Sequence, residues 1–551
     1  MLRGLMMDAP LLISSLITHA AQYEGEIEIV SRTVEGPIHR YTYGESHVRM
    51  CRLANALGRL GVEQGDRIAT LAWNGYRHLE LYFAISGYGA VLHTINPRLF
   101  ADQIKFIVNH AADKYIFLDT TFVPLLEAMA DKLPKVKGYI ILAAGADMPE
   151  TTLPNAMAYE DLLAGETEAY DWPDFDEKAA ASLCYTSGTT GNAKGALYSH
   201  RSTMLHTFSV RLEEGLAVSG DDIVLPAVPM FHANAWGIPY ACAMSGSKLV
   251  LPGPHYDGES MFGLLEDEGV TMTAGVPTIW QMLVDYMRKE NKQFSHPPRV
   301  LIGGAAASVS MIKTFEEEFD CMVRHAWGMT EMSPVGTSGH LNAALRALPA
   351  EQRYAYQAKQ GHALYGVDLK IVDDDGNRLP HDGVAFGELL VRGPWIASAY
   401  FEDEAATAAA FDSEGWFRTG DVATIDDQGW MQIVDRSKDV IKSGGEWISS
   451  IDLENVAVGH PGLVQAAVIG MPHPKWDERP LLIAVAAEGA SPSRDEVIDY
   501  LTDKVAKWWL PDDVQFIDAI PLTATGKISK LQLREMFSDY TLPTADEPGG
   551  A

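Results

Sequence analysis

A glycine- and hydroxyl-rich string in the first half of the chain has the composition of an anion-binding loop. Residues 185–195 read Tyr-Thr-Ser-Gly-Thr-Thr-Gly-Asn-Ala-Lys-Gly. The glycines let backbone N–H groups converge on an anion, the hydroxyls add further donors, and Lys194 adds a positive charge. A Walker A loop is excluded, because Gly-x-x-x-x-Gly-Lys-Ser/Thr cannot be laid on this string. We therefore predict a phosphate-binding loop of another kind, with a solvated turn as the alternative.

Six further strings follow this loop. They are Ile-Gly-Gly-Ala-Ala-Ala-Ser (302–308), Ala-Trp-Gly-Met-Thr-Glu (326–331), Gly-Glu-Leu (387–389), Phe-Arg-Thr-Gly-Asp (417–421), Asp-Arg-Ser-Lys-Asp-Val-Ile-Lys-Ser-Gly-Gly-Glu (435–446) and Thr-Ala-Thr-Gly-Lys-Ile (523–528). Any one could arise by chance, but their order over about 340 residues resembles that of the adenylate-forming superfamily. This superfamily contains acyl-CoA synthetases, luciferases and peptide-synthetase adenylation domains.

The resemblance implies a reaction in which a carboxylate attacks the α-phosphate of ATP. Two anions meet in this step, so its transition state needs concentrated positive charge. Glu331 would hold Mg²⁺ on the phosphates, since a hard cation prefers carboxylate oxygen. Lys527 would bridge the carboxylate and the α-phosphate, and Gly526 allows the tight turn that extends this cationic arm. The expected catalytic set is Lys527, Glu331, Thr186 and Lys438, with ordinary surface positions as the alternative for the charged residues.

The same resemblance assigns the nucleotide-binding residues. Trp327 would stack on adenine, at a position where the family more often has tyrosine, and a core tryptophan is the alternative. Asp421 would accept hydrogen bonds from both ribose hydroxyls, and Arg436 would reach the ribose or the phosphates. For these two residues the alternative is a surface salt bridge. The full set expected to bind ATP and AMP is Thr186, Ser187, Gly188, Thr189, Thr190, Gly191, Lys194, Gly304, Ala305, Ala306, Ala326, Trp327, Gly328, Met329, Thr330, Asp421, Ile433 and Arg436.

One lysine cannot serve both half-reactions of a CoA ligase. The adenylate is made with Lys527 in the cleft, and the thiol of CoA must then enter from the same region. The resemblance implies that the C-terminal domain rotates about a hinge at Lys438, which withdraws Lys527 and brings in a second loop. An exposed linker lysine is the alternative for Lys438. The loop expected to contact CoA consists of Lys442, Ser443, Gly444, Gly445, Glu446 and Trp447.

The acyl group is expected to lie beside Pro-Met-Phe-His-Ala-Asn-Ala-Trp-Gly (229–237), which resembles the segment that lines the acyl tunnel of the family. A bulky Trp236 that faces the tunnel would shorten it and favour short or medium acyl chains. Core packing is the alternative for His232 and for Trp236. The residues expected to contact the acyl substrate are His232, Trp236, Gly303 and Gly304.

Three more strings extend the resemblance beyond the superfamily. Residues 6–17, 444–455 and 507–512 look like the bacterial medium-chain acyl-CoA synthetase branch, which contains the 3-methylmercaptopropionate-CoA ligases of dimethylsulfoniopropionate breakdown. The leading hypothesis is therefore an AMP-forming acid–thiol ligase that uses ATP, Mg²⁺ and CoA and acts on 3-(methylthio)propionate. Straight-chain C4–C8 fatty acids of lipid metabolism are the alternative substrates.

Other functions fit the sequence less well. An adenylate-forming enzyme could pass its acyl group to oxygen or a carrier protein instead of CoA. A catalytically inactive nucleotide-binding or scaffold protein is disfavoured, because Lys527 and Glu331 are both present. A serine hydrolase is disfavoured, because the chain has no Gly-x-Ser-x-Gly elbow.

Strands that alternate with helices must position these strings. Strands are expected at 66–73, 89–95, 114–118 and 138–142, with helices at 76–88, 101–112 and 122–133 between them. A similar alternation runs from about 220 to 325, and short antiparallel hairpins follow beyond 360. After 435 a small αβ pattern begins, with helices at 451–458 and 494–505 and strands at 464–469 and 481–487.

These patterns predict an α/β protein with mixed βα sheets, a β-rich subdomain and a small, mobile α+β C-terminal domain. The expected N-terminal adenylation domain covers 1–435 and the C-terminal domain 436–551, of which 543–551 are expected to be a disordered tail.

Composition narrows the class and the partners. The 551 residues carry a formal net charge of −31 and are 47% hydrophobic and 21% charged, which excludes a disordered protein and disfavours nucleic acid. The chain has four cysteines without metal-ligand spacing and no convincing signal peptide or membrane span, so a cytoplasmic protein is expected. The partners expected are a small carboxylate, ATP and CoA. A homodimer is the default assembly, since dimers are the commonest oligomers.

Overall fold

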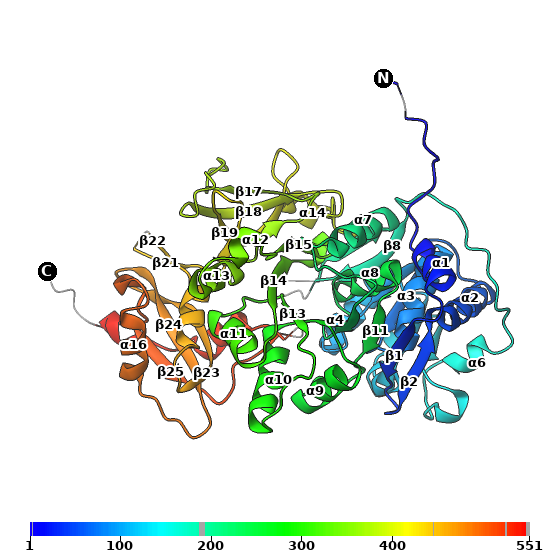
Figure 1. Cartoon of the computed structure of the whole chain (residues 1–551), viewed down its shortest axis with the longest axis horizontal. Helices are drawn as coiled ribbons and strands as arrows, with labels where there is room; N and C mark the ends of the chain where they lie inside the picture. The colour runs from blue at the N-terminus through cyan, green and yellow to red at the C-terminus, as the bar shows by residue number, and fades with distance from the viewer. Residues whose placement is uncertain (3, 187–192, 445, 524–525, 547–551) are drawn as a thin grey trace.

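The computed structural model of the chain describes residues 1–2, 4–186, 193–444, 446–523 and 526–546, without the side chains of 446, 447 and 546. In these ranges the strands form sheets of seven, nine, four and five strands. The first three sheets precede residue 437, and the fourth is built from the C-terminal residues, orange to red in Figure 1. The predicted fold class is confirmed.

The seven-stranded sheet comes from the first alternation of strands and helices. Helix α3 (Tyr76–Tyr88) has the predicted bounds, because Gly89 adopts the left-handed conformation that ends the helix. The phosphate-loop string joins β8 to β9, which pair in antiparallel fashion from Tyr185 opposite Gly195, so the pairing fixes both ends of the loop. In sheet order the strands are β7 (Ala156–Ala158), β6 (Gly138–Ile141), β5 (Tyr115–Leu118), β3 (Arg67–Leu71), β4 (Val91–Thr94), β8 (Ala180–Tyr185) and β9 (Gly195–Ser199).

The nine-stranded sheet carries two of the predicted strings at neighbouring strand ends. Strands β13 and β14 are parallel neighbours, so residues 303–306 and 328–331 leave the sheet at the same edge. In sheet order its strands are β16 (His362–Ala363), β15 (Val335–Ser338), β14 (Val323–Gly328), β13 (Arg299–Ile302), β12 (Met272–Gly275), β10 (Ile223–Pro226), β11 (Lys248–Leu251), β1 (Glu28–Arg32) and β2 (Ile38–Thr42).

The predicted hairpins beyond 360 form the four-stranded antiparallel sheet. Asp421 of β19 pairs with Arg436 of β20, which brings two predicted nucleotide-binding residues side by side. The order is β17 (Asp368–Val372), β18 (Phe386–Arg392), β19 (Phe417–Ile425) and β20 (Met431–Arg436).

The C-terminal part has its own sheet and its own core. In the long hairpin of β23 and β24, β24 also pairs with β21 and with β25, and two hydrophobic clusters cover the faces of the sheet. Its elements are β21 (Ile441–Ser443), β22 (Glu446–Ile448), α15 (Ser450–Ala457), β23 (Leu463–His473), β24 (Asp477–Ala486), α16 (Arg494–Thr502), β25 (Asp513–Phe516) and α17 (Lys530–Met536).

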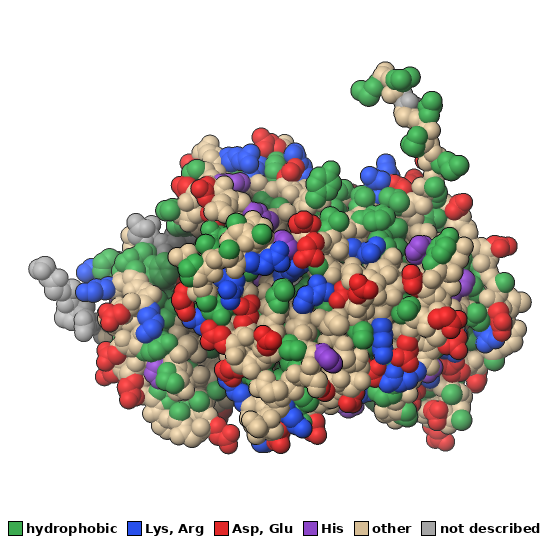
Figure 2. All heavy atoms as spheres, viewed as in Figure 1, with side chains coloured by type: hydrophobic (Ala, Val, Ile, Leu, Met, Phe, Trp, Pro, Cys, Tyr) green, Lys and Arg blue, Asp and Glu red, His purple; other side chains and the backbone are tan. Residues whose placement is uncertain are grey.

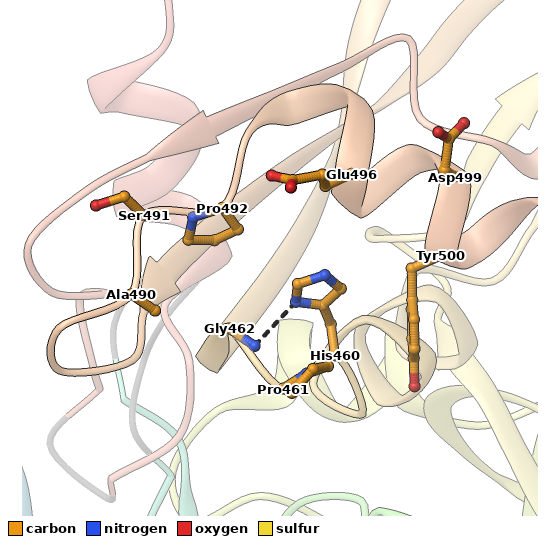
Figure 3. A pocket seen from close by; sticks show the side chains of 9 residues that line it. All are labelled: His460, Pro461, Gly462, Ala490, Ser491, Pro492, Glu496, Asp499 and Tyr500. Carbon is orange, nitrogen blue, oxygen red and sulfur yellow. Dashed lines mark hydrogen bonds between the residues drawn. The ribbon is translucent and has the colours of Figure 1, made fainter.

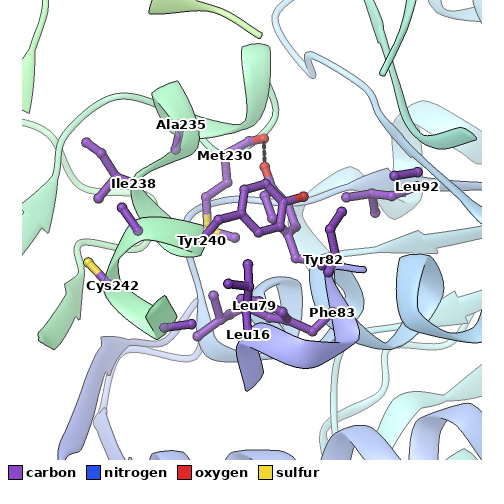
Figure 4. Packing of buried hydrophobic residues seen from close by; sticks show 14 of the residues in the cluster. Leu16, Leu79, Tyr82, Phe83, Leu92, Met230, Ala235, Ile238, Tyr240 and Cys242 are labelled. Carbon is purple, nitrogen blue, oxygen red and sulfur yellow. Dashed lines mark hydrogen bonds between the residues drawn. The ribbon is translucent and has the colours of Figure 1, made fainter. Parts of the chain in front are cut away.

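The largest core joins the two βα sheets through their helices. Tyr82 and Phe83 of α3 pack against Tyr240 of α8 (Ile238–Ser245), and the Tyr82 hydroxyl donates to the carbonyl of Met230 (Figure 4). The start of segment 229–237 is thereby anchored in the core. The remaining helices are α1 (Ser14–Tyr23), α2 (Tyr43–Arg59), α4 (Ala101–Ala111), α5 (Val123–Glu127), α6 (Tyr159–Leu163), α7 (His200–Arg211), α9 (Gly258–Asp267), α10 (Pro277–Lys289), α11 (Val309–Lys313), α12 (Ala343–Arg346), α13 (Ala350–Gln357) and α14 (Glu404–Ala410).

Two predicted segments differ from the structure. The helix expected at 122–133 is only the short α5 with 3₁₀ turns on either side: Met129, with φ −136° and ψ −1°, has already left the helical conformation, and Pro134 disfavours that conformation at Leu133. Where disorder was expected from Pro543, residues Pro543–Asp546 form a 3₁₀ turn in which the Thr544 hydroxyl bonds to Asp512. Residues 547–551 lie outside the described ranges.

The surface is less uniform than the net charge suggests. On the face shown in Figure 2, basic side chains are interspersed among the acidic ones. No helix in the described part of the chain combines the length and the apolar character that a membrane crossing requires.

Candidate active site

The described ends of the phosphate-binding string are held together by hydrogen bonds. The Thr186 amide donates to the Lys194 carbonyl at 2.9 Å, and the Lys194 amide donates to the Thr186 hydroxyl at 3.1 Å. Ser187, Gly188, Thr189, Thr190 and Gly191 lie outside the described residues. Their part in binding phosphate stays a prediction.

Glu331 lies in a 3₁₀ turn after β14 and is 5% exposed. The Tyr400 hydroxyl donates to Glu331 Oε1 at 2.6 Å, and the Ala397 amide donates to the Glu331 carbonyl at 2.7 Å. The amine of Lys194 lies 4.9 Å from the centre of the Tyr400 ring. Tyr400 therefore joins the lysine of the phosphate loop to the predicted metal ligand.

Sequence reasoning did not select Tyr400. The only local signal is an aromatic pair, Tyr400 and Phe401, a few residues after the Gly-Glu-Leu strand. The Phe401 amide donates to the Gly195 carbonyl at 2.8 Å, so this segment is also tied to the phosphate loop. Such contacts between distant segments cannot be read from local patterns.

A single buried carboxylate fits the predicted magnesium ion. Mg²⁺ is usually held by one or two protein carboxylates together with substrate phosphates, and it keeps several waters. The described part of the chain has no group of three or more His, Cys, Asp or Glu side chains that could hold a metal alone. Glu331 therefore suits an ion that arrives with a nucleotide.

The loop after β13 has glycines where other groups approach closely. A Cβ atom on Gly303 would lie 2.8 Å from Trp236 Cη2, and one on Gly304 would lie 3.1 Å from Val276 and 3.6 Å from Lys527 Cε. Gly304 also has a φ of 77°, which favours glycine. The two glycines thus bring the acyl segment and Lys527 against the same loop.

The predicted ribose carboxylate is buried and already has partners. Asp421, 3% exposed, accepts from Trp327 Nε1 at 2.9 Å and forms an ion pair with Arg436 Nε at 2.9 Å. Asp421 and Arg436 thus form the salt bridge that was the alternative, but Asp421 is buried and not at the surface. Stacking of Trp327 on adenine stays a prediction.

The remaining predicted nucleotide residues lie on β14, on the loop after β13 and on β20. Ala326, Gly328, Met329 and Thr330 lead from β14 into the Glu331 turn, and the Ala305 carbonyl, in the loop after β13, lies 3.4 Å from His325 Nε2 of β14. A cleft of about 550 Å³ opens between the larger part and α15, and its lining includes Ala306 and Ile433.

Lys527 reaches this site from the C-terminal part. Its turn has the expected geometry: Gly526 has a φ of 79°, and the Lys527 amide donates to the Thr523 hydroxyl at 3.2 Å. Burial lowers the pKa of Lys527 to about 8, Arg436 acts in the same direction, and Asp421 and Glu331 oppose it. The amine therefore lies within the field of both predicted functional carboxylates.

The acyl segment has an unusual backbone. Ala233, Asn234, Ala235 and Trp236 all have positive φ values, between 43° and 57°. Asn234 is 2% exposed and anchors this turn by donating from Nδ2 to the Ser182 hydroxyl of β8 at 2.9 Å. The turn directs Trp236 onto the glycine loop.

His232 is held neutral near the amine. Burial lowers the pKa of His232 to about 4, and the charge of Lys527 acts in the same direction. Trp236 packs on Gly303 and His232 lies within the field of Lys527, so both border the predicted acyl site, and their contact with the acyl group stays a prediction.

The predicted CoA loop is the hairpin of β21 and β22. Lys442 and Gly444 are exposed, Ser443 accepts from Arg479 at 3.2 Å, and the Gly444 amide donates to the Trp476 carbonyl at 2.8 Å. Gly445 and the side chains of Glu446 and Trp447 lie outside the described residues. In Figure 1 the hairpin lies at the outer end of the C-terminal part, away from β13 and β14.

A second hollow lies within the C-terminal part. It has a volume of about 670 Å³, and His460, Glu496 and Tyr500 are among its lining residues (Figure 3). None of its lining residues belongs to the predicted site, so it adds nothing to the arrangement above.

Comparisons with known proteins follow the same two-part division. The profile of the AMP-binding enzyme family matches residues 16–401, and that of the AMP-binding enzyme C-terminal domain matches 452–527. The chain is 52% identical to a 3-methylmercaptopropionyl-CoA ligase of Ruegeria lacuscaerulensis, covering 97% of this chain and 99% of that one.

Two further relatives widen the picture. A medium-chain-fatty-acid–CoA ligase of Ectopseudomonas oleovorans is 48% identical over 98% of each chain. The crystal structure of ATP-bound MatB from Rhodopseudomonas palustris is 26% identical and superposes with a TM-score of 0.80, covering 96% of this chain and 99% of that one.

Proposed function

The chain belongs to the AMP-binding enzyme family, as its motifs predicted, and we propose that it is an ATP-dependent, AMP-forming acyl-CoA ligase whose preferred acid is 3-(methylthio)propionate. The observation that carries the proposal is the amine of Lys527 inside the site that Glu331 and Asp421 border. In this proposal a cation from the C-terminal part completes a predicted anion-binding site in the larger part. The near full-length identity to a 3-methylmercaptopropionyl-CoA ligase supports the substrate.

The first half-reaction joins the acid to AMP. A carboxylate oxygen of the acid attacks the α-phosphorus of ATP, the bond to the pyrophosphate breaks, and pyrophosphate leaves. Lys527, protonated in most molecules at pH 7 with a pKa of about 8, faces both anions and stabilises the charge that develops between them. Asp421 and Trp327 would orient the ribose, and the phosphate loop with Lys194 would hold the phosphates.

Magnesium has a defined place in this scheme. Glu331 would hold the ion, and the Tyr400 hydroxyl positions the Glu331 carboxylate through its hydrogen bond. A bound Mg²⁺ would neutralise charge on the phosphates. Glu331 is 5% exposed, so this carboxylate is largely shielded from bulk water.

The second half-reaction transfers the acyl group to CoA. The thiol sulfur attacks the carbonyl carbon of the acyl-adenylate, the bond to AMP breaks, and AMP leaves with the acyl-CoA. In the structure Lys527 lies beside Gly304 and within the field of Glu331 and Asp421, whereas the Lys442–Trp447 hairpin lies away from β13 and β14. We therefore infer a rotation about Lys438 between the two steps, which exchanges the lysine for the hairpin.

The acyl pocket favours a short acid. The Trp236 indole packs on Gly303 and is held by the left-handed turn behind it, which limits the length available to a chain at this point. A medium-chain fatty acid is the second candidate, supported by the 48% identity to a medium-chain ligase. One methylene changes the free energy of transition-state binding by only about 1–3 kcal/mol, so we expect the enzyme to accept acids of both classes.

Steady-state assays test the proposal directly. AMP release from ATP should depend on both CoA and acid, and kcat/KM should be highest for 3-(methylthio)propionate in a screen of C2–C12 acids. Pyrophosphate release without any CoA-dependent AMP release would overturn the ligase assignment. A maximum of kcat/KM at C6–C8 acids would keep the ligase assignment but make a medium-chain fatty acid the preferred substrate.

Location and assembly follow as further proposals. We place the enzyme in the cytoplasm, where ATP and CoA are available and where its four free, buried cysteines suit a reducing environment. We expect a homodimer, and the mass in solution tests that expectation.

A further inference from the structure

A buried polar junction connects the strand before the predicted hinge to the C-terminal part. Asp435, 1% exposed, is the last residue but one of β20, and its Oδ2 accepts from the Ser450 amide at 2.8 Å and the Ser450 hydroxyl at 2.5 Å. The Ser449 hydroxyl donates to the Val434 carbonyl at 2.6 Å. Both serines are at the start of α15.

The same junction reaches the helix that follows the catalytic turn. Lys530 is the first residue of α17 and comes three residues after Lys527. Its amine forms an ion pair with Glu454 Oε1 of α15 at 2.8 Å and donates to the Ser450 hydroxyl. Asp435, Ser450 and Lys530 thus form one connected group, called the junction below.

The two sides of the junction belong to different parts of the molecule. Asp435 is on β20, and β20 pairs with β19 so that Asp435 faces Val422, the neighbour of the buried Asp421. Ser450 and Lys530 lie beyond Lys438, on elements that pack around the C-terminal sheet. A turn of the chain at Lys438 therefore separates Asp435 from Ser450.

We propose that Asp435, Ser450 and Lys530 form a latch that holds the C-terminal part in the orientation in which Lys527 enters the site. The proposal rests on the proposed function, since it concerns the step between the two half-reactions. The three residues are positioning residues, because they set where Lys527 lies without touching the reacting groups.

The chemistry of the junction suits a reversible latch. When it is closed, a buried carboxylate is satisfied by two hydrogen bonds from one serine and by a nearby ammonium group. When it opens, water can solvate the same charges, so the net free energy that favours closure is small compared with its gross interactions. Such a balance allows both orientations to be populated, as alternation between two half-reactions requires.

The test compares the two half-reactions in Ser450→Ala and Asp435→Asn. Pyrophosphate release in a single turnover reports the first step, and acyl-CoA formation from supplied acyl-adenylate and CoA reports the second. We expect the first rate to fall about 3–10-fold in either variant while the second is unchanged or faster. Equal losses in both steps, or an unchanged first step, would overturn the latch.

Arg494→Gln is the matched control. Arg494 forms an ion pair with Asp513 at 2.7 Å within the C-terminal part, so its loss disturbs that part without touching the junction. It should leave the ratio of the two rates unchanged. A shift of this ratio equal to that of Ser450→Ala would mean that any loosening of the C-terminal part has the same effect, and the latch would be rejected.

A second measurement does not depend on turnover. Acylation of Lys527 by a small amine-reactive reagent, followed by peptide mass spectrometry, should be several-fold faster in Ser450→Ala and Asp435→Asn than in the wild type. If Lys527 were labelled at the same rate in both variants as in the wild type, the latch would be overturned, even for a protein that catalyses neither half-reaction. Loss of both half-reactions in the wild type, with faster labelling in the variants, would reject the proposed function and retain the latch.

Discussion

Two loops of the C-terminal part lie in different places, although both are predicted to act on the same acyl group. The turn at Lys527 is inserted beside Gly304 and lies in the field of Glu331 and Asp421. The hairpin of β21 and β22 is exposed at the outer end of the same part. Under the proposed mechanism this arrangement fits the first half-reaction, and we therefore expect mutations in the two loops to separate the two steps.

Lys527→Ala should give the largest separation. Loss of a group that stabilises developing charge typically lowers the rate by about 10²–10³. Pyrophosphate release should fall by that factor, while acyl-CoA formation from supplied adenylate should change little. Equal pyrophosphate release in wild type and variant would reject the catalytic role of Lys527.

Tyr400→Phe should affect the same half-reaction for a different reason. It removes the hydroxyl that donates to Glu331 and keeps the ring beside Lys194. A hydrogen bond to a charged group contributes about 1.5–3 kcal/mol, so the first rate at limiting Mg²⁺ should fall about 10–150-fold. Calorimetric titration of Mg·ATP should show weaker binding, and unchanged affinity would contradict this role of Tyr400.

Gly444→Val should slow the second half-reaction and leave the first unchanged. Gly444 has a φ of 61°, and a Cβ there would lie 2.9 Å from the Trp476 ring, so the hairpin must shift. Displacement of a positioned loop by a fraction of an ångström should slow the CoA step by roughly tenfold. Single-turnover pyrophosphate release serves as the internal control, and a matching fall there would remove the distinction between the loops.

The pH dependence should also separate the two steps. The pKa of Lys527 is lowered to about 8, so its positive charge is present below that pH and is lost as the pH rises above it. For the first step, kcat/KM for ATP should therefore fall by roughly tenfold between pH 7 and pH 9. Lys527→Arg should be slower but lack this alkaline decline, and a decline that persists in Lys527→Arg would assign the titration to another group.

Trp236→Ala should give the smallest difference between the steps, because both handle the same acyl group. Shortening this side chain lengthens the pocket beside Gly303. The ratio of kcat/KM for octanoate to that for 3-(methylthio)propionate should rise by up to about tenfold. An unchanged ratio in a two-substrate competition assay would show that Trp236 does not limit chain length.

Local patterns predicted much of this molecule. The alternation of strands and helices predicted α3 to its bounds, and the Thr-Gly-Lys string predicted the turn that carries Lys527. In both cases the signal is contained within a few residues, as a helical period with a terminal glycine or as a glycine with positive φ.

Contacts between distant segments were not predictable in the same way. Nothing near Tyr400 indicates that it meets Glu331 and Lys194, and nothing near Trp327 indicates a hydrogen bond to Asp421. The prediction of one helix over 122–133 relied on the apolar period and did not account for the breaks on either side of α5. Side-chain partners of this kind are set by how the sheets pack, which one sequence does not encode locally.

The order of the site residues along the chain has a consequence during synthesis. Asp421 and Arg436 precede Lys527 by about 100 residues, and a ribosome adds about 5–20 residues each second. For roughly 5–20 s the nascent polypeptide has its nucleotide pocket but lacks the amine that joins acid to AMP. An unfinished chain should therefore form the mixed anhydride about 10²–10³-fold more slowly than the complete one, and we expect full activity only after Lys527 has been translated.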